Sequence, residues 1–279
     1  MFYYQLKNEL WKLFGKKRTY IGFGMFVLGQ LLIIIIFRYT PAQHTIQRSI
    51  ERTGFDPGQY LSMLTFSTVM VLALAVTLMP LFVALVGGDL VSKEAEDGTL
   101  RMILSRPISR VRLLCVKWLA GVIFAVALVL ALGLFGLLFS SFWFPVNEGM
   151  FVFIPEKFLN VYGYGEGLQH YALAHLFMVT KACTIMSLAF MFSCFNMKPA
   201  AATILALSLI IIDRVMMMMP YFSDIQYWFL SYHLDAWQLM LSSPVPWWRL
   251  GEALCVILAA NLTFLVIGAT AFQMRDIKS

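Results

Sequence analysis

Charged side chains suited to binding a partner are concentrated in one polar stretch, residues 87–117, between two apolar segments. Glu94 and Glu96 form its acidic pair, and basic residues follow from Arg101 to Lys117. The chemistry on offer is electrostatic: complementary charges could dock a soluble partner here. The simpler interpretation is a solvated loop whose positive charges set the topology of the chain.

Two short amphipathic helices joined by a tight turn are expected in this stretch. The carboxylate of Asp89 can accept hydrogen bonds from exposed backbone N–H groups and so cap a helix that runs through the acidic pair. Gly98 can adopt the left-handed conformation that ends this helix. Thr99 can cap the second helix, which Pro107 prevents from continuing.

A second candidate site is Lys181, which lies in the middle of a long apolar stretch. An ammonium group inside a membrane is costly and normally has a partner. Asp213 is the nearest candidate partner by depth, and Arg214 is beside it. A structural ion pair and a role in lining a transport pathway both fit, and Asp213 could instead lie at the outer membrane interface.

Metal binding and acid–base catalysis have little support in the sequence. The four cysteines include no CxxC pair. His170 and His175 are five residues apart, so they do not share a helix face as i,i+4 neighbours would. The methionines at 216–219 could suggest copper(I), but Met is a common apolar filler. We expect no catalytic residue, no metal and no cofactor bound by this chain.

Membrane-spanning helices must position these groups. Of the 279 residues 60% are hydrophobic and 13% are charged, whereas soluble domains carry about 25% charged residues. A span needs about 20 apolar residues to cross ~30 Å of hydrocarbon. The composition therefore predicts an all-α membrane protein in one domain, residues 1–279, and six stretches approach the required length: 20–37, 61–86, 113–139, 171–192, 200–219 and 250–272.

The distribution of the 21 Lys and Arg residues predicts the topology. Most of them fall in segments 1–19, 87–112, 193–199 and 273–279, which alternate with the poorly charged loops. The positive-inside rule places these segments, including both termini, in the cytoplasm of a multi-pass protein of the inner cell membrane. Because the charge flanks apolar runs, the net charge of +6 does not indicate a nucleic-acid partner.

The remaining segments are predicted to lie at the membrane surfaces. Residues 1–19 begin with an amphipathic helix that would rest on the membrane, although a short soluble helix is the alternative. Connections 140–170 and 220–249, on the outer side, are rich in aromatic residues, which prefer the interface. The second connection should form short helices that dip into or lie on the outer leaflet. Pro80 offers a kink site in the long second span.

The polar stretch also carries a recognisable motif. It reads E-x-E-x-G-T-L, then L-S-x-P-x-S-R, with a Lys seven residues later: Glu94, Glu96, Gly98, Thr99, Leu100, Leu104, Ser105, Pro107, Ser109, Arg110 and Lys117. Together with the six spans, the amphipathic first helix and the aromatic region before the last span, this motif resembles the permeases of type-2 ATP-binding-cassette exporters. The resemblance extends over most of the chain.

The resemblance implies a permease whose residues 87–112 form the coupling region, with a coupling helix between spans two and three. Two permeases, identical or different, would pair side by side, each resting on a separate ATPase subunit that binds ATP and Mg²⁺. The helix within 1–19 is similar to the family's connecting helix, which also touches the ATPase. The ATPase-coupling residues would be Glu94, Glu96, Gly98, Thr99, Leu100, Arg101, Ser105, Pro107 and Arg110, with the closest contacts at Glu94, Glu96, Gly98, Thr99 and Arg101.

The sequence contains no G-x-x-x-x-G-K-[ST] loop to cradle phosphates, so we expect ATP hydrolysis in a separate polypeptide. Two alternatives stay open. A stand-alone secondary transporter would show inverted repeats and helices broken at the midplane. An intramembrane enzyme would need paired carboxylates or a His cluster at the span ends.

Overall fold

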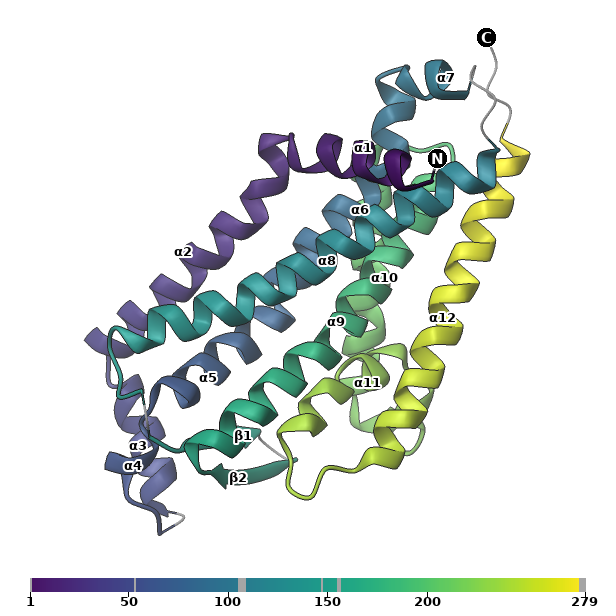
Figure 1. Cartoon of the computed structure of the whole chain (residues 1–279). Helices are drawn as coiled ribbons and strands as arrows, with labels where there is room; N and C mark the ends of the chain where they lie inside the picture. The colour runs from purple at the N-terminus through teal and green to yellow at the C-terminus, as the bar shows by residue number, and fades with distance from the viewer. Residues whose placement is uncertain (1, 53, 105–108, 147, 155–156, 276–279) are drawn as a thin grey trace.

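The computed structural model describes residues 2–52, 54–104, 109–146, 148–154 and 157–275. Its architecture is a bundle of long helices that run between two ends of the molecule (Figure 1). Within these described ranges, five helices are long and apolar enough to cross a membrane, and a bent pair supplies a sixth crossing. The expectation of an all-α membrane protein is confirmed.

Each predicted apolar stretch lies largely within one of these helices. Most of the helices run several residues beyond the predicted limits, because Lys, Arg and Glu are good helix formers and can continue a span into the headgroup region. The spans are α2 (Lys17–Tyr39), α5 (Met63–Val76) with α6 (Leu78–Glu96), α8 (Arg110–Ser141), α9 (Tyr164–Cys194), α10 (Pro199–Met218) and α12 (Trp247–Met274).

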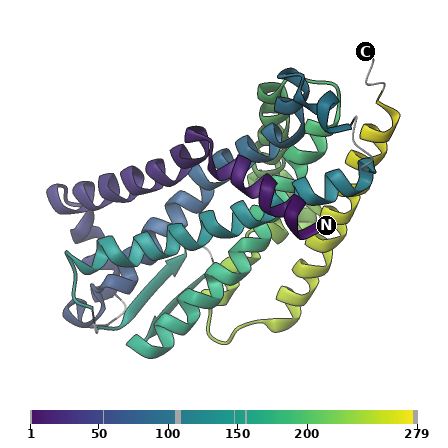
Figure 2. The same cartoon turned by 45° about the horizontal axis from the view of Figure 1, so that its top comes forward.

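The two ends of the bundle carry different elements (Figures 1 and 2). The basal end is formed by α1 (Phe2–Phe14), α7 (Thr99–Leu104) and the C-terminal end of α12. The hairpin end carries α3 (Ala42–Arg52), α4 (Pro57–Tyr60), β1 (Met150–Ile154) and β2 (Phe158–Tyr162). The chain therefore starts and finishes its helices at the same end.

The antiparallel hairpin β1–β2 was not predicted, since segment 140–170 was expected only to place aromatic residues at an interface. Met150 lies opposite Tyr162 in this hairpin, and both side chains are buried. The Thr65 hydroxyl accepts a hydrogen bond from the Phe151 N–H at 2.9 Å. The hairpin is thus fixed to the start of α5.

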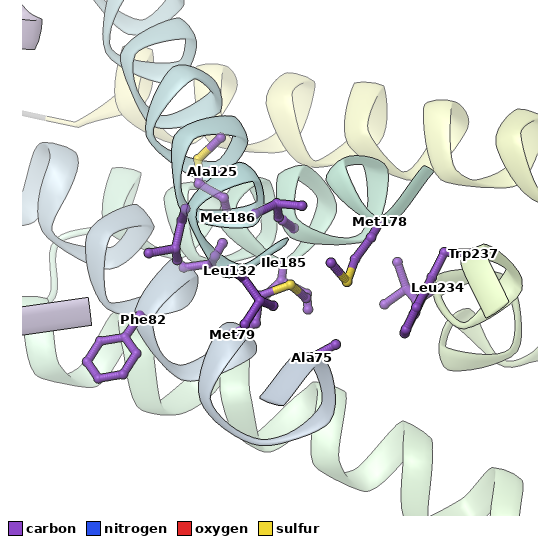
Figure 3. Close-up of a cluster of buried hydrophobic side chains, with 14 of the residues drawn as sticks. Ala75, Met79, Phe82, Ala125, Leu132, Met178, Ile185, Met186, Leu234 and Trp237 are labelled. Atoms are coloured by element: carbon purple, nitrogen blue, oxygen red, sulfur yellow. The ribbon is translucent and has the colours of Figure 1, made fainter. Parts of the chain in front are cut away.

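Helix α9 is the centre of the bundle and packs against α6, α8, α10 and α12. Met178, Ile185 and Met186 on this helix are fully buried. Figure 3 shows these side chains in one apolar cluster with Met79 from α6 and Trp237 from the connection that follows α10. Methionine side chains adapt to the irregular gaps between crossing helices.

The second span is broken at Thr77, three residues before Pro80, the predicted kink site. In an unbroken helix the ring of Pro80 would clash with the carbonyl of Val76, so the break lies where this proline requires it. α5 and α6 meet at 45° across Thr77, whose hydroxyl donates to the carbonyl of Ala73 at 2.9 Å. Pro80 lies in the first turn of α6, where its missing N–H would have no intrahelical acceptor. α6 then continues through Asp89 to Glu96, so the expectation that Asp89 caps a separate helix is wrong. The segment between Asp89 and Gly98 contains no glycine or proline that would end the helix earlier.

The connection between α10 and α12 folds back into the bundle. It contains the 3₁₀ helix η1 (Pro220–Trp228), α11 (Leu230–Leu234) and the 3₁₀ helix η2 (Ala236–Leu241). Leu234 and Trp237 are 2% and 1% exposed, and η2 packs directly on α9. α11 and η2 are therefore part of the core and not of a membrane surface. η1 contains no buried residue, and its Tyr221 and Trp228 are 89% and 76% exposed, so the predicted short surface helices remain a prediction for this part of the connection.

The close packing of α6 on its neighbours depends on a glycine pair, in which Gly87 faces α9 and Gly88 faces α10. A Cβ added at Gly87 would lie 2.5 Å from the backbone oxygen of Met186, which cannot move without shifting α9. We expect Gly87→Ala to lower the free energy of unfolding in detergent by about 1–3 kcal/mol, as overpacking does. Gly24→Ala is the matched control, because a Cβ on that residue of α2 has nothing within 4 Å. Equal thermal unfolding midpoints for the two variants would contradict the packing argument.

Candidate functional site

A tight turn at Gly98 joins α6 to α7 at the basal end. Gly98 has φ of 71°, a left-handed conformation that glycine adopts without steric cost, as the sequence predicted. Thr99 begins α7, and its hydroxyl donates to the carbonyl of Glu94 at 3.3 Å, so it acts as a donor rather than as the predicted capping acceptor. The side chain of Leu100, 3% exposed, anchors α7 to the bundle.

A cluster of four charged side chains lies beneath this turn and is called here the basal charge cluster: Glu9, Lys12, Glu94 and Lys117. Lys117 in α8 is 1% exposed, and its Nζ lies 2.9 Å from Glu9 Oε2 and 2.7 Å from Glu94 Oε2. Lys12 Nζ lies 2.9 Å from Glu9 Oε1 and 3.5 Å from Glu94 Oε1. Two carboxylates and two ammonium groups therefore alternate, and they join α1, α6 and α8.

The electrostatics of the cluster keep its α1 members charged. Burial alone would raise the pKa of Glu9, but the ammonium groups of Lys117 and Lys12 outweigh it and hold this pKa below its usual value. Burial would lower the pKa of Lys12, and the carboxylates of Glu9 and Glu94 reverse that shift. Glu9 and Lys12 are therefore both charged at neutral pH.

A separate ion pair joins the start of α2 to α6. Arg18 Nη1 lies 2.9 Å from Asp89 Oδ2, in the part of α6 nearest the basal end. Asp89 therefore binds a neighbouring helix and does not cap its own. Because α6 leads directly into α7, the first two helices of the chain are linked by charge to the turn at Gly98.

Arg110 has a positioning role at the start of α8. Its guanidinium donates to the backbone oxygens of Phe272, Gln273 and Arg275 at 3.4, 3.0 and 3.1 Å. The last carbonyls of a helix have no intrahelical donor, and a positive charge near them is favourable. Arg110 thus fixes the C-terminal end of α12 to α8.

The predicted coupling residues therefore divide into internal and exposed groups. Glu94, 12% exposed at its side chain, belongs to the basal charge cluster, and Leu100 to the core. Of the predicted residues, Glu96 is exposed, and it is grouped here with three neighbours that were not predicted, Lys93, Asp97 and Met102, as the α6–α7 corner. Lys93 Nζ lies 2.9 Å from Glu96 Oε2 and 3.1 Å from Asp97 Oδ1. The side chain of Arg101 and residues Ser105 and Pro107 lie outside the described part of the structure.

The predicted pairing of Lys181 with Asp213 is wrong. Lys181 Nζ donates to Asp235 Oδ1 at 2.7 Å, and Arg214 donates to the other oxygen, Oδ2, at 3.0 Å. Asp213 instead accepts from the backbone N–H groups of Leu230 and Ser231 at 3.2 and 2.6 Å, at the start of α11. The error arose because the sequence does not show that the connection carrying Asp235 returns to the depth of Lys181.

Sequence reasoning missed Glu9, Lys12 and Asp235 as partners of buried charges. The available signal was Lys117, an ammonium group at the end of a predicted span that needs carboxylates. Among the residues that the structure describes, no group of three or more His, Cys, Asp or Glu side chains is arranged to hold a metal ion. The arrangement of the basal end suits mechanical linkage between helices and docking of a partner.

The basal charge cluster predicts a large loss of stability for Lys117→Met. Removing this buried ammonium leaves Glu9 and Glu94 adjacent with one shared cation, a change that costs about 3–5 kcal/mol when a buried pair is broken. Lys93→Met, at the exposed α6–α7 corner, is the control and should change the thermal unfolding midpoint little. Similar midpoints for both variants in detergent would show that the cluster does not hold α1 in place.

The comparisons with known proteins agree with this architecture. The model of the ABC-2 family transporter proteins matches residues 7–226, from α1 into η1. No curated protein matches the chain. The matched region contains the basal charge cluster, the α6–α7 corner and the first five crossings. The chain belongs to the ABC-2 transporter family and is a membrane permease component of that class.

Proposed function

We propose that this chain is the membrane subunit of an ATP-driven exporter. It would pair with a second permease, identical or different, and with separate ATPase subunits that bind ATP and Mg²⁺. The observation that carries the proposal is the continuous helix α6, which runs from the bend at Thr77 to the exposed α6–α7 corner. A displacement applied to the corner would be transmitted along this helix into the bundle.

The contacts of α6 support a lever of this kind. At the basal end it is joined to α1 and α8 by the basal charge cluster and to α2 by Asp89 and Arg18. At Gly87 it packs closely against α9. The bend at Thr77 separates α6 from α5, so the basal half of this span can move with α1 and α7 while α5 stays with the hairpin end.

The docking surface for the ATPase is the α6–α7 corner. Glu96 and Asp97 are half-exposed carboxylates, and Met102 adds an exposed apolar side chain on α7. A partner with a basic, partly apolar groove fits this chemistry. Glu94 supports the surface from inside through Lys117, so it acts by positioning the corner rather than by touching the partner.

The basal end is proposed to face the cytoplasm, with α1 resting on the inner membrane surface. Lys7, Lys16, Lys17 and Arg18 lie in or just after α1, and Arg110 and Arg112 begin α8. Basic residues are enriched in the cytoplasmic segments next to membrane spans. The hairpin end would then face the outside of the cell.

One observation favours a second candidate, a secondary transporter driven by an ion gradient. A broken span and a buried ion pair are features of such proteins, and here Thr77, Lys181 and Asp235 border one cavity. The two functions differ in their energy source. Transport by the purified chain alone, driven by a proton gradient in vesicles, would support this candidate over the exporter.

Charge reversal at Glu96 tests ATPase docking. We expect Glu96→Lys to reduce co-purification of the ATPase with the tagged chain by about tenfold or more, because like charges across an interface cost several kcal/mol. The side chain is 44% exposed, so the permease itself should stay folded. Glu51→Lys, on exposed α3 at the hairpin end, is the matched control and should retain the ATPase.

Reversal of Glu94 would be a poor test, since it would break the basal charge cluster. If the ATPase and its coupled hydrolysis persist undiminished in Glu96→Lys, the assignment of the corner as the docking surface is wrong. The same co-purification with the unmodified chain must yield a polypeptide that hydrolyses ATP. Its absence would contradict the exporter proposal as a whole.

Cysteine labelling tests the orientation. With the four native cysteines replaced, Glu51→Cys at the hairpin end should react with a membrane-impermeant maleimide in intact cells. Glu96→Cys at the basal end should react only after the membrane is permeabilised. Both parent side chains belong to exposed residues, so accessibility to the reagent depends on the side of the membrane. The reverse pattern would place the α6–α7 corner outside the cell and exclude a cytoplasmic ATPase there.

A further inference from the structure

Two cavities adjoin where the returning connection meets the bend of the second span. The smaller, about 200 Å³, lies between the α5–α6 bend, α9, α10 and α11. The larger, about 440 Å³, lies between η1, α11, η2, β2 and the start of α12. The side chain of Asp235 borders both of them. Each is far larger than the ~30 Å³ that one water occupies, so the pair can hold a sizeable ligand.

The charges around these cavities do not balance. Asp235 is already occupied on both oxygens, by Lys181 and by Arg214. Lys157, which lines the larger cavity, donates to the neutral amide oxygen of Gln238 at 2.7 Å and has no carboxylate among its described hydrogen bonds and ion pairs. The charged side chains that line the two cavities are four cations and two carboxylates: Lys157, Lys181, Arg214, Arg249, Asp235 and Glu252.

Lys157 interacts with the other charged groups of the two cavities. Loss of hydration lowers the pKa of its ammonium group, Asp235 opposes that change, and the cations Arg214 and Lys181 add to it. An anion placed between Lys157 and Arg214 would relieve this repulsion. Ionisable side chains inside a membrane protein are costly, and where they occur they commonly mark a site that binds a ligand or an ion.

The smaller cavity adds an apolar wall to the charged site. Seven apolar side chains line it: Val76, Pro80, Leu81, Leu207, Ile210, Ile211 and Leu234. Leu81 and Ile211 among them are 41% and 58% exposed on the outer surface of the bundle. These exposed residues belong to helices long and apolar enough to span a membrane, so we infer that the cavity opens toward the hydrocarbon of the bilayer. A hydrocarbon chain can enter there while its headgroup reaches Arg214.

We propose that these cavities bind an amphiphile with an anionic headgroup. Arg214 and Lys157 bind its phosphate or carboxylate, and the wall between the α5–α6 bend and α10 receives its hydrocarbon chain. A small inorganic anion would leave this apolar wall unused, and a neutral lipid would leave the excess positive charge unmatched. This site is independent of the proposed exporter function, since binding can be measured on the purified chain without an ATPase.

Native mass spectrometry of the full-length chain in detergent tests the proposal directly. We expect one equivalent of a short-chain phosphatidylglycerol to bind at least about tenfold more tightly than the matching phosphatidylcholine. Inorganic phosphate in millimolar excess should not displace it, because phosphate lacks the hydrocarbon chain. Equal affinity for the two lipids would overturn the proposal. Complete displacement by inorganic phosphate would also overturn it and indicate a site for free anions.

Two charge variants are expected to change the affinity for phosphatidylglycerol in opposite directions, which a purely structural role of these residues would not produce. A third variant is the control. Arg214→Gln should weaken phosphatidylglycerol binding by about tenfold or more, the value of one charged hydrogen bond, while Lys181 still pairs with Asp235. Glu252→Gln removes an exposed negative charge from the lining and should tighten binding about two- to fivefold. Arg48→Gln, exposed on α3 outside the cavities, is the control and should leave the affinity unchanged. Equal affinities for all three variants would contradict the site.

Filling the apolar wall tests the second half of the site. Ile211→Trp places a large side chain at the open edge of the smaller cavity and leaves Arg214 and Lys157 in place. We expect it to reduce binding of phosphatidylglycerol at least about tenfold, without lowering the thermal unfolding midpoint of the lipid-free chain. Retention of full affinity would show that the hydrocarbon chain does not occupy this cavity, and the proposed binding mode would be wrong.

Discussion

The structure depends most on the ammonium group of Lys117, which is held between the carboxylates of Glu9 and Glu94. A buried charge must have a partner, since its removal from water costs several kcal/mol that only close opposite charges can offset. The three residues come from α8, α1 and α6, so this one requirement fixes three helices relative to one another. It also explains why α1 lies across α8 instead of extending away from the bundle (Figure 2).

The same constraint operates deeper in the bundle at Lys181. Its pairing with Asp235, reinforced by Arg214, holds the returning connection against α9. A bilayer offers no water to solvate such a group, so the chain must bring its own carboxylate to the site. The connection is therefore folded inward, and the two cavities beside Asp235 result from this path.

Between the ion pairs of Lys117 and those of Lys181, the helices are held together by the packing of their side chains and backbones. Apolar side chains gain little from leaving lipid, so association of helices in a membrane depends on close approach of their backbones. Gly87 provides that approach, since a Cβ there would collide with the backbone oxygen of Met186 on α9. The bundle is closely packed at its centre, and its second span is bent by 45° at Thr77.

The sequence alone determined the all-α membrane class, the location of the six crossings, the left-handed turn at Gly98 and the short helix after it, because hydropathy and glycine conformation act locally. Tertiary structure decided which carboxylates accompany Lys117 and Lys181 and how far α6 extends. It also decided that Glu94 is internal while Glu96 is exposed. These outcomes depend on the path of the connections in space, since an ion pair joins residues by distance and depth and leaves no periodic trace in the sequence.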